Sequence, residues 1–355
     1  MDHLSQTALI QGPDGKPVIS HNIPLPTILP TEILIKTIAV GLNPMDYKIP
    51  TNFPSPGAII GCDLAGTVAS IGSEVAHPTR PLNVGDRVCG GVHGSNALDH
   101  ESGAFAEYVK ADARLVLKIP DSMSWEEAAT LGVAIKTVSL SLWRSLGLEA
   151  TPERPTENPF PVLVYGGSTT MGTMAIQMLK LSGLTPIATC SPRNFALVKS
   201  FGAEQTFDYS QPGCAPDIKS FTKNSLKYVL DCITDAESIQ LCYAAIGRAG
   251  GRYSCLENPP QHLLSRKAVK ADFVMPLKIF GKRIALGGGY ERAACQSTFE
   301  AGVELIIAAQ KLLDCGQIRC HPPRILSPGF GGILEGLDLL KRGQVSGQKL
   351  VVRIS

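Results

Sequence analysis

The sequence lacks the features that would mark a secreted, membrane-spanning or nucleic-acid-binding protein. It contains no run of about 18 apolar residues, and its first residues lack the basic region and apolar core of a signal peptide. Its formal net charge is +2, from 33 basic and 31 acidic residues, which gives no reason to expect a polyanionic partner. We therefore expect a cytoplasmic protein that binds neither nucleic acid nor membrane.

Closely spaced cysteine pairs are also absent. The ten cysteines are scattered along the chain, and no two have the Cys-x-x-Cys spacing of a metal-binding or redox pair. Several, such as Cys190 and Cys232, fall in apolar runs typical of buried strands, where a free thiol packs as a small hydrophobe. We expect reduced core cysteines and no disulfide framework in a chain of this size.

The length and the patterning predict more than one domain. A chain of 355 residues exceeds what one small core holds. In the first part, apolar runs are separated by Gly, Pro and Asn, which predicts an irregular β-barrel-like domain. Its expected strands are 32–42, 63–72, 86–92 and 105–111.

In the middle of the chain, strands and helices alternate, which predicts an α/β domain with a parallel, doubly wound sheet. The expected strands are 162–166, 186–190, 205–209, 228–233, 251–256 and 283–287, and the expected helices are 171–182, 193–201 and 238–246. We expect this nucleotide-binding domain to cover residues 136–295. It would be inserted into a first domain made of residues 1–135 and 296–355.

Two helix signals lie outside the expected parallel sheet. Ser124 and Glu127 fit the S-x-x-E capping box, which predicts a helix start within residues 121–143. Residues 297–316 are amphipathic over a long stretch and predict a helix, and the chain ends in the strand-like run KLVVRI (349–354).

The stretch PVLVYGGSTTMGTMAIQMLK (161–180) joins a buried strand to a helix through a glycine turn. In the G-x-G-x-x-G fingerprint of dinucleotide sites, such a turn binds a pyrophosphate with backbone N–H groups and the positive helix end. Three glycines remain here: Gly166, Gly167 and Gly172. Hydroxyl groups fill the middle of the turn and would donate to phosphate oxygens: Ser168, Thr169 and Thr170. The alternative is a tight turn that binds nothing, but the strand before it and the helix after it favour a nucleotide.

The end of the second strand indicates which nucleotide. An NAD-binding chain usually has Asp or Glu about 20 residues after the fingerprint, to hold the ribose 2′-hydroxyl. This chain has no carboxylate there. It has instead Ser191, Pro192, Arg193 and Asn194, which supply a hydroxyl, a guanidinium and an amide. Lys199 follows further on, and Tyr209 lies at the end of the third strand. Because a guanidinium suits a 2′-phosphate, we predict NADP(H) as the cofactor.

These motifs resemble the medium-chain dehydrogenase/reductase superfamily over essentially the full chain. The matching signatures are IIGCDLAGTVASIG (59–72), VGDRV (84–88), GAFAEYV (103–109), the glycine turn and GQVSGQKLVVRI (343–354). The resemblance implies a GroES-like catalytic domain beside a Rossmann domain. Zinc-dependent members carry His-Glu where this chain has Cys62-Asp63, and Cys where it has Asn43. We therefore expect no metal, and we interpret His93 and His100 as loop residues.

A closer resemblance is to the fungal trans-acting enoyl reductases. It is carried by NPMDYK (43–48), VLVYGGST (162–169), PIATCSPRNF (186–195), YVLDCIT (228–234) and AAIGRAGG (244–251). It implies a stand-alone, zinc-independent monomer of secondary metabolism. Such an enzyme uses NADPH to reduce an α,β-unsaturated thioester on the acyl carrier domain of a polyketide synthase, or of a polyketide–peptide synthetase hybrid.

The same resemblance implies the site residues. Lys48 and Thr137 are the expected catalytic residues, and Thr137, Ile279 and Phe280 are expected to line the substrate. The residues expected to bind the cofactor are Met45, Asp46, Tyr47, Lys48, Ser168, Thr169, Thr170, Met171, Ser191, Pro192, Arg193, Asn194, Tyr209, Leu256, Val345 and Ser346. A solvated lysine at Lys48, and a helix-interior threonine at Thr137 that bonds to the preceding turn, are the structural alternatives.

Three other functions stay open at this point. One is a quinone or enone reductase that acts on small diffusible molecules. Another is a related reductase that catalyses reductive cyclisation of a polyketide product. The last is a protein that binds NADPH without turnover.

Overall fold

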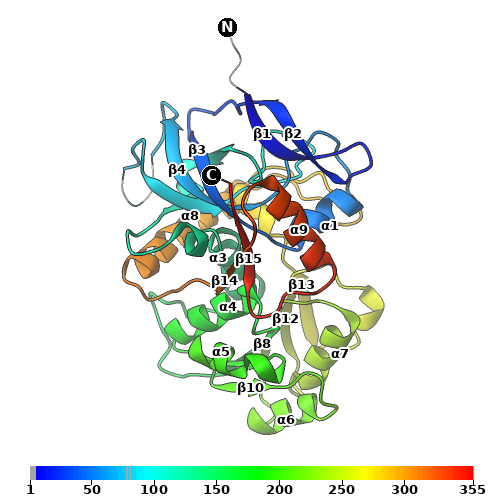
Figure 1. Cartoon of the computed structure of the whole chain (residues 1–355). Helices are drawn as coiled ribbons and strands as arrows, with labels where there is room; N and C mark the ends of the chain where they lie inside the picture. Colours follow the sequence, from blue (N-terminus) through cyan, green and yellow to red (C-terminus); the bar gives the residue numbers. More distant parts are fainter. Residues whose placement is uncertain (1–4, 77–78, 80, 355) are drawn as a thin grey trace. The chain divides into compact units, whose positions relative to one another are not determined.

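Figure 1 shows the computed structural model of the chain, which describes residues 5–76, 79 and 81–354. Within these residues the chain divides into two compact units. The second unit is Thr137–Pro276, and the first contains the residues before it and those from Leu277 onward. The sequence pattern predicts the second boundary near residue 295, whereas residues 277–295 belong to the first unit.

The described strands of the first unit form a seven-stranded sheet and a two-stranded antiparallel sheet. In the larger sheet the strand order is β14-β15-β3-β4-β5-β7, and β6 pairs with β3. The bounds are β3 (Glu32–Gly41), β4 (Asp63–Ile71), β5 (Arg87–Gly91), β6 (Tyr108–Asp112), β7 (Val116–Lys118), β14 (Pro323–Ile325) and β15 (Lys349–Arg353), and the small sheet is β1 (Ser5–Gln11) with β2 (Pro17–Pro24). The four strands expected early in the chain are confirmed as β3 to β6.

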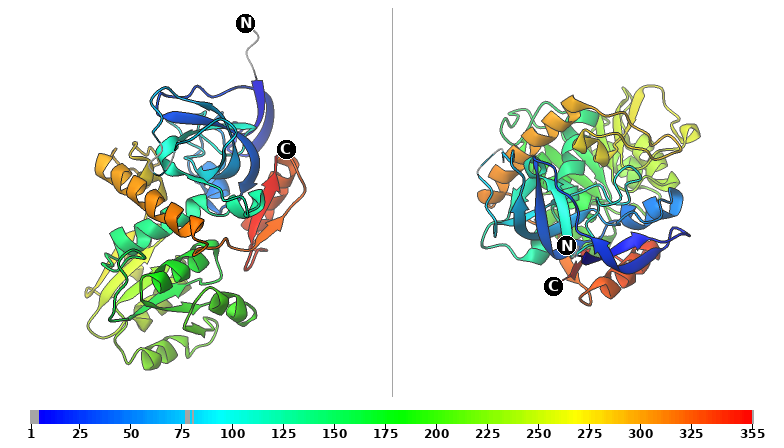
Figure 2. Two further views of the ribbon diagram at one scale, coloured as in Figure 1. Left: turned by 90° about the vertical axis from the view of Figure 1, so that its left-hand side faces the viewer. Right: turned by 90° about the horizontal axis from the view of Figure 1, so that it is seen from above.

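Strand β3 organises this unit because it is apolar along most of its length. Ile33, Ile35 and Val40 are fully buried in the core, and β3 pairs with β4, β6 and β15. The C-terminal strand β15 pairs antiparallel with it, with Val351 opposite Gly41. The last part of the chain therefore belongs to the core of the first unit (Figure 2).

The helices of the first unit are α1 (Met45–Asn52), α2 (Trp125–Ala128), α8 (Gln296–Asp314) and α9 (Phe330–Lys341), and α3 (Gly132–Ser139) crosses the boundary between the units at Thr137. Helix α8 confirms the long amphipathic helix expected at 297–316. The capping box at the start of α2 is also confirmed, since the Ser124 hydroxyl accepts from the Glu127 N–H and the Glu127 carboxylate accepts from the Ser124 N–H.

The helical stretch expected within 121–143 is confirmed, but it is divided, because the chain turns between α2 and α3. The Thr130 hydroxyl donates to the Glu127 carbonyl at 2.8 Å, which competes with continuation of the helix. Helix α3 then starts afresh at Gly132, where a Cβ would lie 2.2 Å from the Gly90 carbonyl carbon. A π-helical turn, Leu140–Ser145, follows α3.

In the second unit the described strands form a parallel six-stranded sheet of order β10-β9-β8-β11-β12-β13. Its strands are β8 (Pro161–Tyr165), β9 (Thr185–Thr189), β10 (Gln205–Phe207), β11 (Tyr228–Asp231), β12 (Gly251–Cys255) and β13 (Val269–Phe273). Its helices are α4 (Thr170–Leu181), α5 (Phe195–Ser200), α6 (Cys214–Phe221) and α7 (Ala236–Ala245). This order confirms the doubly wound Rossmann fold, with α4 and α5 on one face and α6 and α7 on the other (Figures 1 and 2).

Two elements of the second unit differ from the sequence expectation. The sixth strand is β13 and not 283–287, where Ile284 makes only an isolated bridge to Arg292 before the glycines at 287–289. Strand β13 lies at the sheet edge with mostly exposed residues, and its apolar residues Val269, Ala271 and Phe273 alternate with Lys270 and Asp272 over only five positions, a strand signal that was not used. Helix α6 was not predicted because Pro216 lies within its first turn, a position that tolerates proline.

Across the described residues, none of the helices has the length and apolar character needed to cross a membrane.

Candidate functional site

The glycine turn of the second unit is built by close backbone contacts. Gly166 follows β8 with a φ of 76°, in the left-handed region that favours glycine. At Gly172 a Cβ would lie 2.3 Å from the Gly166 carbonyl oxygen, so only glycine lets α4 start against the turn. The Thr169 hydroxyl accepts from the Gly172 N–H at 3.0 Å and donates to the Gly166 carbonyl at 2.8 Å.

These contacts decide which groups of the turn remain for a ligand. The Thr169 hydroxyl caps α4, so it is already used within the turn. Ser168, Thr170 and Met171 are half-buried, and the N–H groups of Thr170 and Met171 lie in the first turn of α4, where a helix supplies no acceptor. This helix end therefore fits an anionic group such as a pyrophosphate.

The residues expected to hold a 2′-phosphate come together at the ends of two strands. Ser191 follows β9 and Tyr209 follows β10, and their hydroxyl oxygens lie 3.2 Å apart. Arg193 is exposed in the short turn Pro192–Asn194 that starts at Ser191. The nearby carboxylate, Asp208, accepts from the Ser210 N–H and hydroxyl and from Gln211, so it is turned into its own loop.

Strand β11 ends in a buried carboxylate that the sequence analysis did not single out. Asp231 accepts from the hydroxyls of Ser238 at 2.6 Å and Tyr253 at 2.8 Å, and from the N–H of Thr234 at 2.9 Å. Burial raises the pKa of Asp231. Thr234 is held at a φ of 61°, and its hydroxyl accepts from the N–H of Leu256, an expected cofactor residue. The motif YVLDCIT contained this signal, because an Asp directly after an apolar run has to find donors.

In the first unit, Met45, Asp46, Tyr47 and Lys48 form the first turn of α1. Asp46 is 2% exposed and its carboxylate accepts from the Asn43 N–H at 2.7 Å, so this side chain serves the start of the helix. Burial raises the pKa of Asp46 to about 7. Met45, Tyr47 and Lys48 are half-buried.

Thr137 lies in α3 and carries a buried hydroxyl without a protein partner. The residue is 2% exposed, and its Oγ1 has no hydrogen-bond partner among the residues that the structure describes. Its carbonyl accepts from the Ser141 hydroxyl at 2.8 Å, at the start of the π-helical turn. Because a buried hydroxyl is costly to leave unpaired, the side chain offers a donor to a ligand. The structural alternative, a Thr137 hydroxyl bonded to the preceding turn, does not occur among the described residues.

The residues at the zinc positions of related enzymes do not fit a metal. The Lys349 ammonium lies 2.6 Å from the Asp63 carboxylate and 2.6 Å from the Asn43 side-chain oxygen. The three zinc positions are occupied by Asn43, Asp63 and Cys62. The Lys349 ammonium already lies between the first two, and burial raises the pKa of the Cys62 thiol, which keeps it protonated. Within the described ranges, no three His, Cys, Asp or Glu side chains group as a metal site requires.

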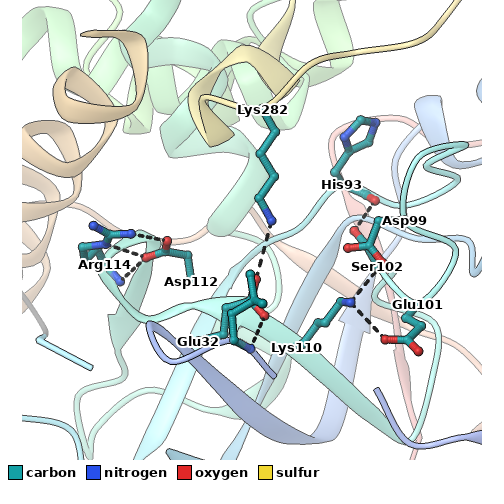
Figure 3. A network of polar contacts seen from close by, with 10 residues as sticks. Glu32, His93, Asp99, Glu101, Ser102, Lys110, Asp112, Arg114 and Lys282 are labelled. Carbon is teal, nitrogen blue, oxygen red and sulfur yellow. Dashed lines mark hydrogen bonds and ion pairs between the residues drawn. The ribbon is translucent and has the colours of Figure 1, made fainter. Parts of the chain in front are cut away.

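A cavity of about 60 Å³ lies inside the first unit. Its lining includes Phe280 and His93, whose rings stack with centroids 6.4 Å apart. Figure 3 shows the charged groups around it: Lys110 bridges Asp99 and Glu101, while Lys282 lies 3.6 Å from Glu32. Ile279, expected beside Phe280, is 1% exposed and packs on Gly302 of α8, so it supports the wall from behind.

His93 and Lys136 are buried polar residues next to Phe280. His93 is 7% exposed, and burial lowers its pKa to about 4, so the ring is neutral near pH 7. The Lys136 ammonium donates to the Gly91 carbonyl at 2.7 Å and lies 5.0 Å from the centre of the Phe280 ring. Burial lowers the pKa of Lys136 to about 8. His93 lies in the loop after β5, as expected, with its ring buried against Phe280, and His100 bonds to the Ser55 hydroxyl at 3.0 Å.

The last two expected cofactor residues, Val345 and Ser346, lie between α9 and β15. Val345 is half-buried and Ser346 is exposed. Lys349, three residues after Ser346, is buried at the start of β15, so the end of this segment is anchored to the core of the first unit.

Comparisons with known proteins match the chain along its length. Two family models match it, an alcohol dehydrogenase GroES-like domain over residues 29–121 and a zinc-binding dehydrogenase over residues 170–305. Trans-enoyl reductase ccsC of Aspergillus clavatus is 50% identical over 350 residues, covering 98% of this chain and 96% of that protein.

Solved structures match at lower identity. CurK enoyl reductase has a TM-score of 0.77 at 18% identity, over 99% of this chain and 100% of its own. Mycobacterial Rv1454c complexed with NADPH has a TM-score of 0.72 at 22% identity, over 98% of this chain and 100% of its own. At these identities the two structures show the shared fold.

Proposed function

The chain belongs to the trans-enoyl reductases of the medium-chain dehydrogenase/reductase superfamily, and from this premise we propose that it reduces an α,β-unsaturated polyketide thioester with NADPH. The thioester is carried by the acyl carrier domain of a partner polyketide synthase or polyketide–peptide synthetase hybrid. The observation that carries this proposal is the 50% identity to a trans-enoyl reductase across nearly the whole of both chains.

Groups in the second unit support NADPH over NADH. The turn after β8 and the start of α4 offer N–H groups for the pyrophosphate, with Gly172 allowing the close approach. Ser191, Arg193 and Tyr209 offer two hydroxyls and a guanidinium for the 2′-phosphate. We assign the remaining cofactor contacts to Asn194, Leu256, Val345, Ser346 and the first turn of α1.

When bound, NADPH would supply a hydride for the β-carbon of the thioester. The Thr137 hydroxyl donates to the thioester oxygen as negative charge develops there, which is the role its unpaired, buried Oγ1 suits. The Lys48 ammonium adds positive charge on the ribose or the enolate side. We assign the proton for the α-carbon to water.

The acyl chain would lie against Phe280. This ring lines the cavity of the first unit with His93, and Ile279 supports it from the core. The apolar part of the lining is Phe280 with Val92, Leu115, Val116 and Phe299, and the rest is largely polar or charged, including Glu32, Asp99, Lys110, Asp112 and Lys282.

The first experiment compares substrates with the same purified protein. NADPH oxidation is followed with a crotonyl thioester carrying a pantetheine arm, and separately with a simple quinone. Turnover of the thioester alone supports the proposal. Turnover of the quinone alone would replace it with a quinone reductase, and tight NADPH binding without either turnover would leave a cyclising reductase or a binding protein.

The second experiment tests Thr137. Thr137→Val keeps the shape but removes the hydroxyl, and the loss of one donor to a developing oxyanion lowers kcat by about 10²-fold or more. Thr137→Ser is the matched control, because it keeps the donor and is expected to hold kcat within about tenfold. Equal kcat for the valine variant and the wild type would remove Thr137 from the mechanism.

A further inference from the structure

A buried ion pair in the first unit connects the end of the chain to two helix starts. The Asp63 carboxylate is fully buried and accepts from the Lys349 ammonium at 2.6 Å, from the Val133 N–H at 2.7 Å and from the Asn43 side-chain amide at 3.0 Å. The Lys349 ammonium also donates to the Asn43 side-chain oxygen at 2.6 Å. We call these four residues, Asn43, Asp63, Val133 and Lys349, the Asp63 cluster.

Each partner of Asp63 lies next to a segment that carries a proposed site residue. Asn43 precedes α1, whose first turn ends at Lys48. Val133 is the second residue of α3, and Thr137 follows it one turn later on the same helix. Lys349 opens β15, directly after the segment with Val345 and Ser346.

The fold makes room for the Lys349 side chain. At Gly41, a Cβ would lie 2.9 Å from the Lys349 Cε and 2.3 Å from the Ala129 carbonyl oxygen. Glycine at this position of β3 therefore lets the aliphatic stem of Lys349 pass between β3 and the chain after α2.

The energetics of buried ion pairs suggest that Asp63 and Lys349 orient their neighbours more than they stabilise the fold. Removing a carboxylate and an ammonium from water costs several kcal/mol per ion, and apolar residues of similar volume often give equal or greater stability. An ion pair with fixed partners nevertheless holds them in one geometry. Here the fixed partners are the backbone of α3 and the side chain that precedes α1.

We propose that Lys349 is a positioning residue for the reduction: paired with Asp63, it holds α1 and α3 so that Lys48 and Thr137 keep their places. The proposal rests on the proposed function for its activity readout. It does not rest on that function for its structural readout, since the mobility of α1 can be measured whether or not the chain reduces a thioester.

The decisive variant is the double substitution Lys349→Met with Asp63→Asn. It removes both charges together, so neither is left buried and unpaired, and the side-chain oxygen of the new amide still accepts from the Val133 N–H. Lys341→Met is the matched control, because Lys341 is an exposed lysine in the last turn of α9.

We expect the double variant to fold, with NADPH affinity within about tenfold of the wild type, since the turn after β8 is untouched. Its kcat for the crotonyl thioester falls by about 10- to 100-fold, the scale of a 1 Å misplacement of catalytic groups. Hydrogen exchange of the amides of Met45–Asn52, measured by mass spectrometry, becomes at least about tenfold faster, while α4 and α7 exchange as in the wild type. The control matches the wild type in all of these measurements.

Three results would overturn the proposal. Wild-type exchange in α1 would show that the cluster does not hold the helix, and wild-type kcat in a folded double variant would show that its positioning does not matter. Failure of the double variant to fold would make the pair a source of stability instead. If the wild type itself does not reduce the thioester, the proposed function fails, and exchange in α1 alone decides the role of Lys349.

Discussion

Replacing Gly172 with alanine tests whether the turn after β8 holds the cofactor phosphates. A Cβ there would lie 2.3 Å from the Gly166 carbonyl oxygen and 2.7 Å from the Gly167 Cα. Both are backbone atoms, so no side chain can rotate away, and the turn and the start of α4 must separate by roughly 1 Å in a closely packed interior. The N–H groups of the turn then move away from those at the start of α4, so the two sets can no longer both donate to the same phosphate.

A shift of this size is expected to remove about one hydrogen bond to a charged phosphate. Such a bond contributes about 1.5–3 kcal/mol, which corresponds to an NADPH Kd that is about 10- to 150-fold weaker. Isothermal titration calorimetry measures the Kd directly, and circular dichroism shows whether the variant is folded. A folded Gly172→Ala protein whose Kd stays within about twofold of the wild type would refute the assignment of the phosphates to this turn.

Gly331→Ala is the matched control for this variant. Gly331 lies in α9, and nothing lies within 4 Å of the position its Cβ would take. Alanine there is expected to leave NADPH binding unchanged and to stabilise the first unit by about 0.4–1 kcal/mol, because it restricts the unfolded chain.

Three further predictions concern binding and stability. Tyr209→Phe removes the hydroxyl that lies 3.2 Å from the Ser191 hydroxyl, and calorimetry should show weaker NADPH binding with unchanged NADH binding; equal weakening of both would disprove a 2′-phosphate contact. Ser124→Ala removes the capping box of α2 and should lower the free energy of unfolding by about 1 kcal/mol in urea titrations, whereas no change would mean that the cap is not needed. Burial raises the pKa of Asp46 to about 7, so as pH rises from its unfolded pKa near 4 the unfolded chain loses this proton first and stability falls until about pH 7. Asp46→Asn should remove that fall from the pH dependence of the melting temperature, and parallel curves for the variant and the wild type would contradict this prediction. The lowered pKa of His93 reduces stability as pH falls. Because both proteins contain His93, its contribution cancels when their curves are compared.

The sequence carried the parts of the fold that depend on repeating patterns. Alternation of strands and helices predicted the parallel sheet, and the S-x-x-E pattern located the capped start of α2. The elements that could not be predicted depend on contacts with residues distant in sequence. The edge strand β13 is held in the sheet by pairing with β12, because its own five residues are mostly exposed and contribute little to the core.

The same limit applies to the site. Glycine spacing predicted the turn after β8, and the missing carboxylate after β9 pointed to Ser191 and Arg193. Lys349 is one lysine in a C-terminal strand, and nothing near it in sequence indicates that it meets Asp63, 286 residues earlier. Likewise, only packing shows that the hydroxyl of Thr137 is buried without a partner among the described residues.

The most direct test of the account is isotopic. The protein is incubated with a crotonyl pantetheine thioester and NADPH deuterated at C4 of the nicotinamide, on each face in turn, and the product is analysed by mass spectrometry and NMR. The account predicts a saturated thioester with one deuterium on its β-carbon, from one of the two labelled faces. Deuterium at the carbonyl carbon, or no reduced product from protein saturated with NADPH, would contradict it.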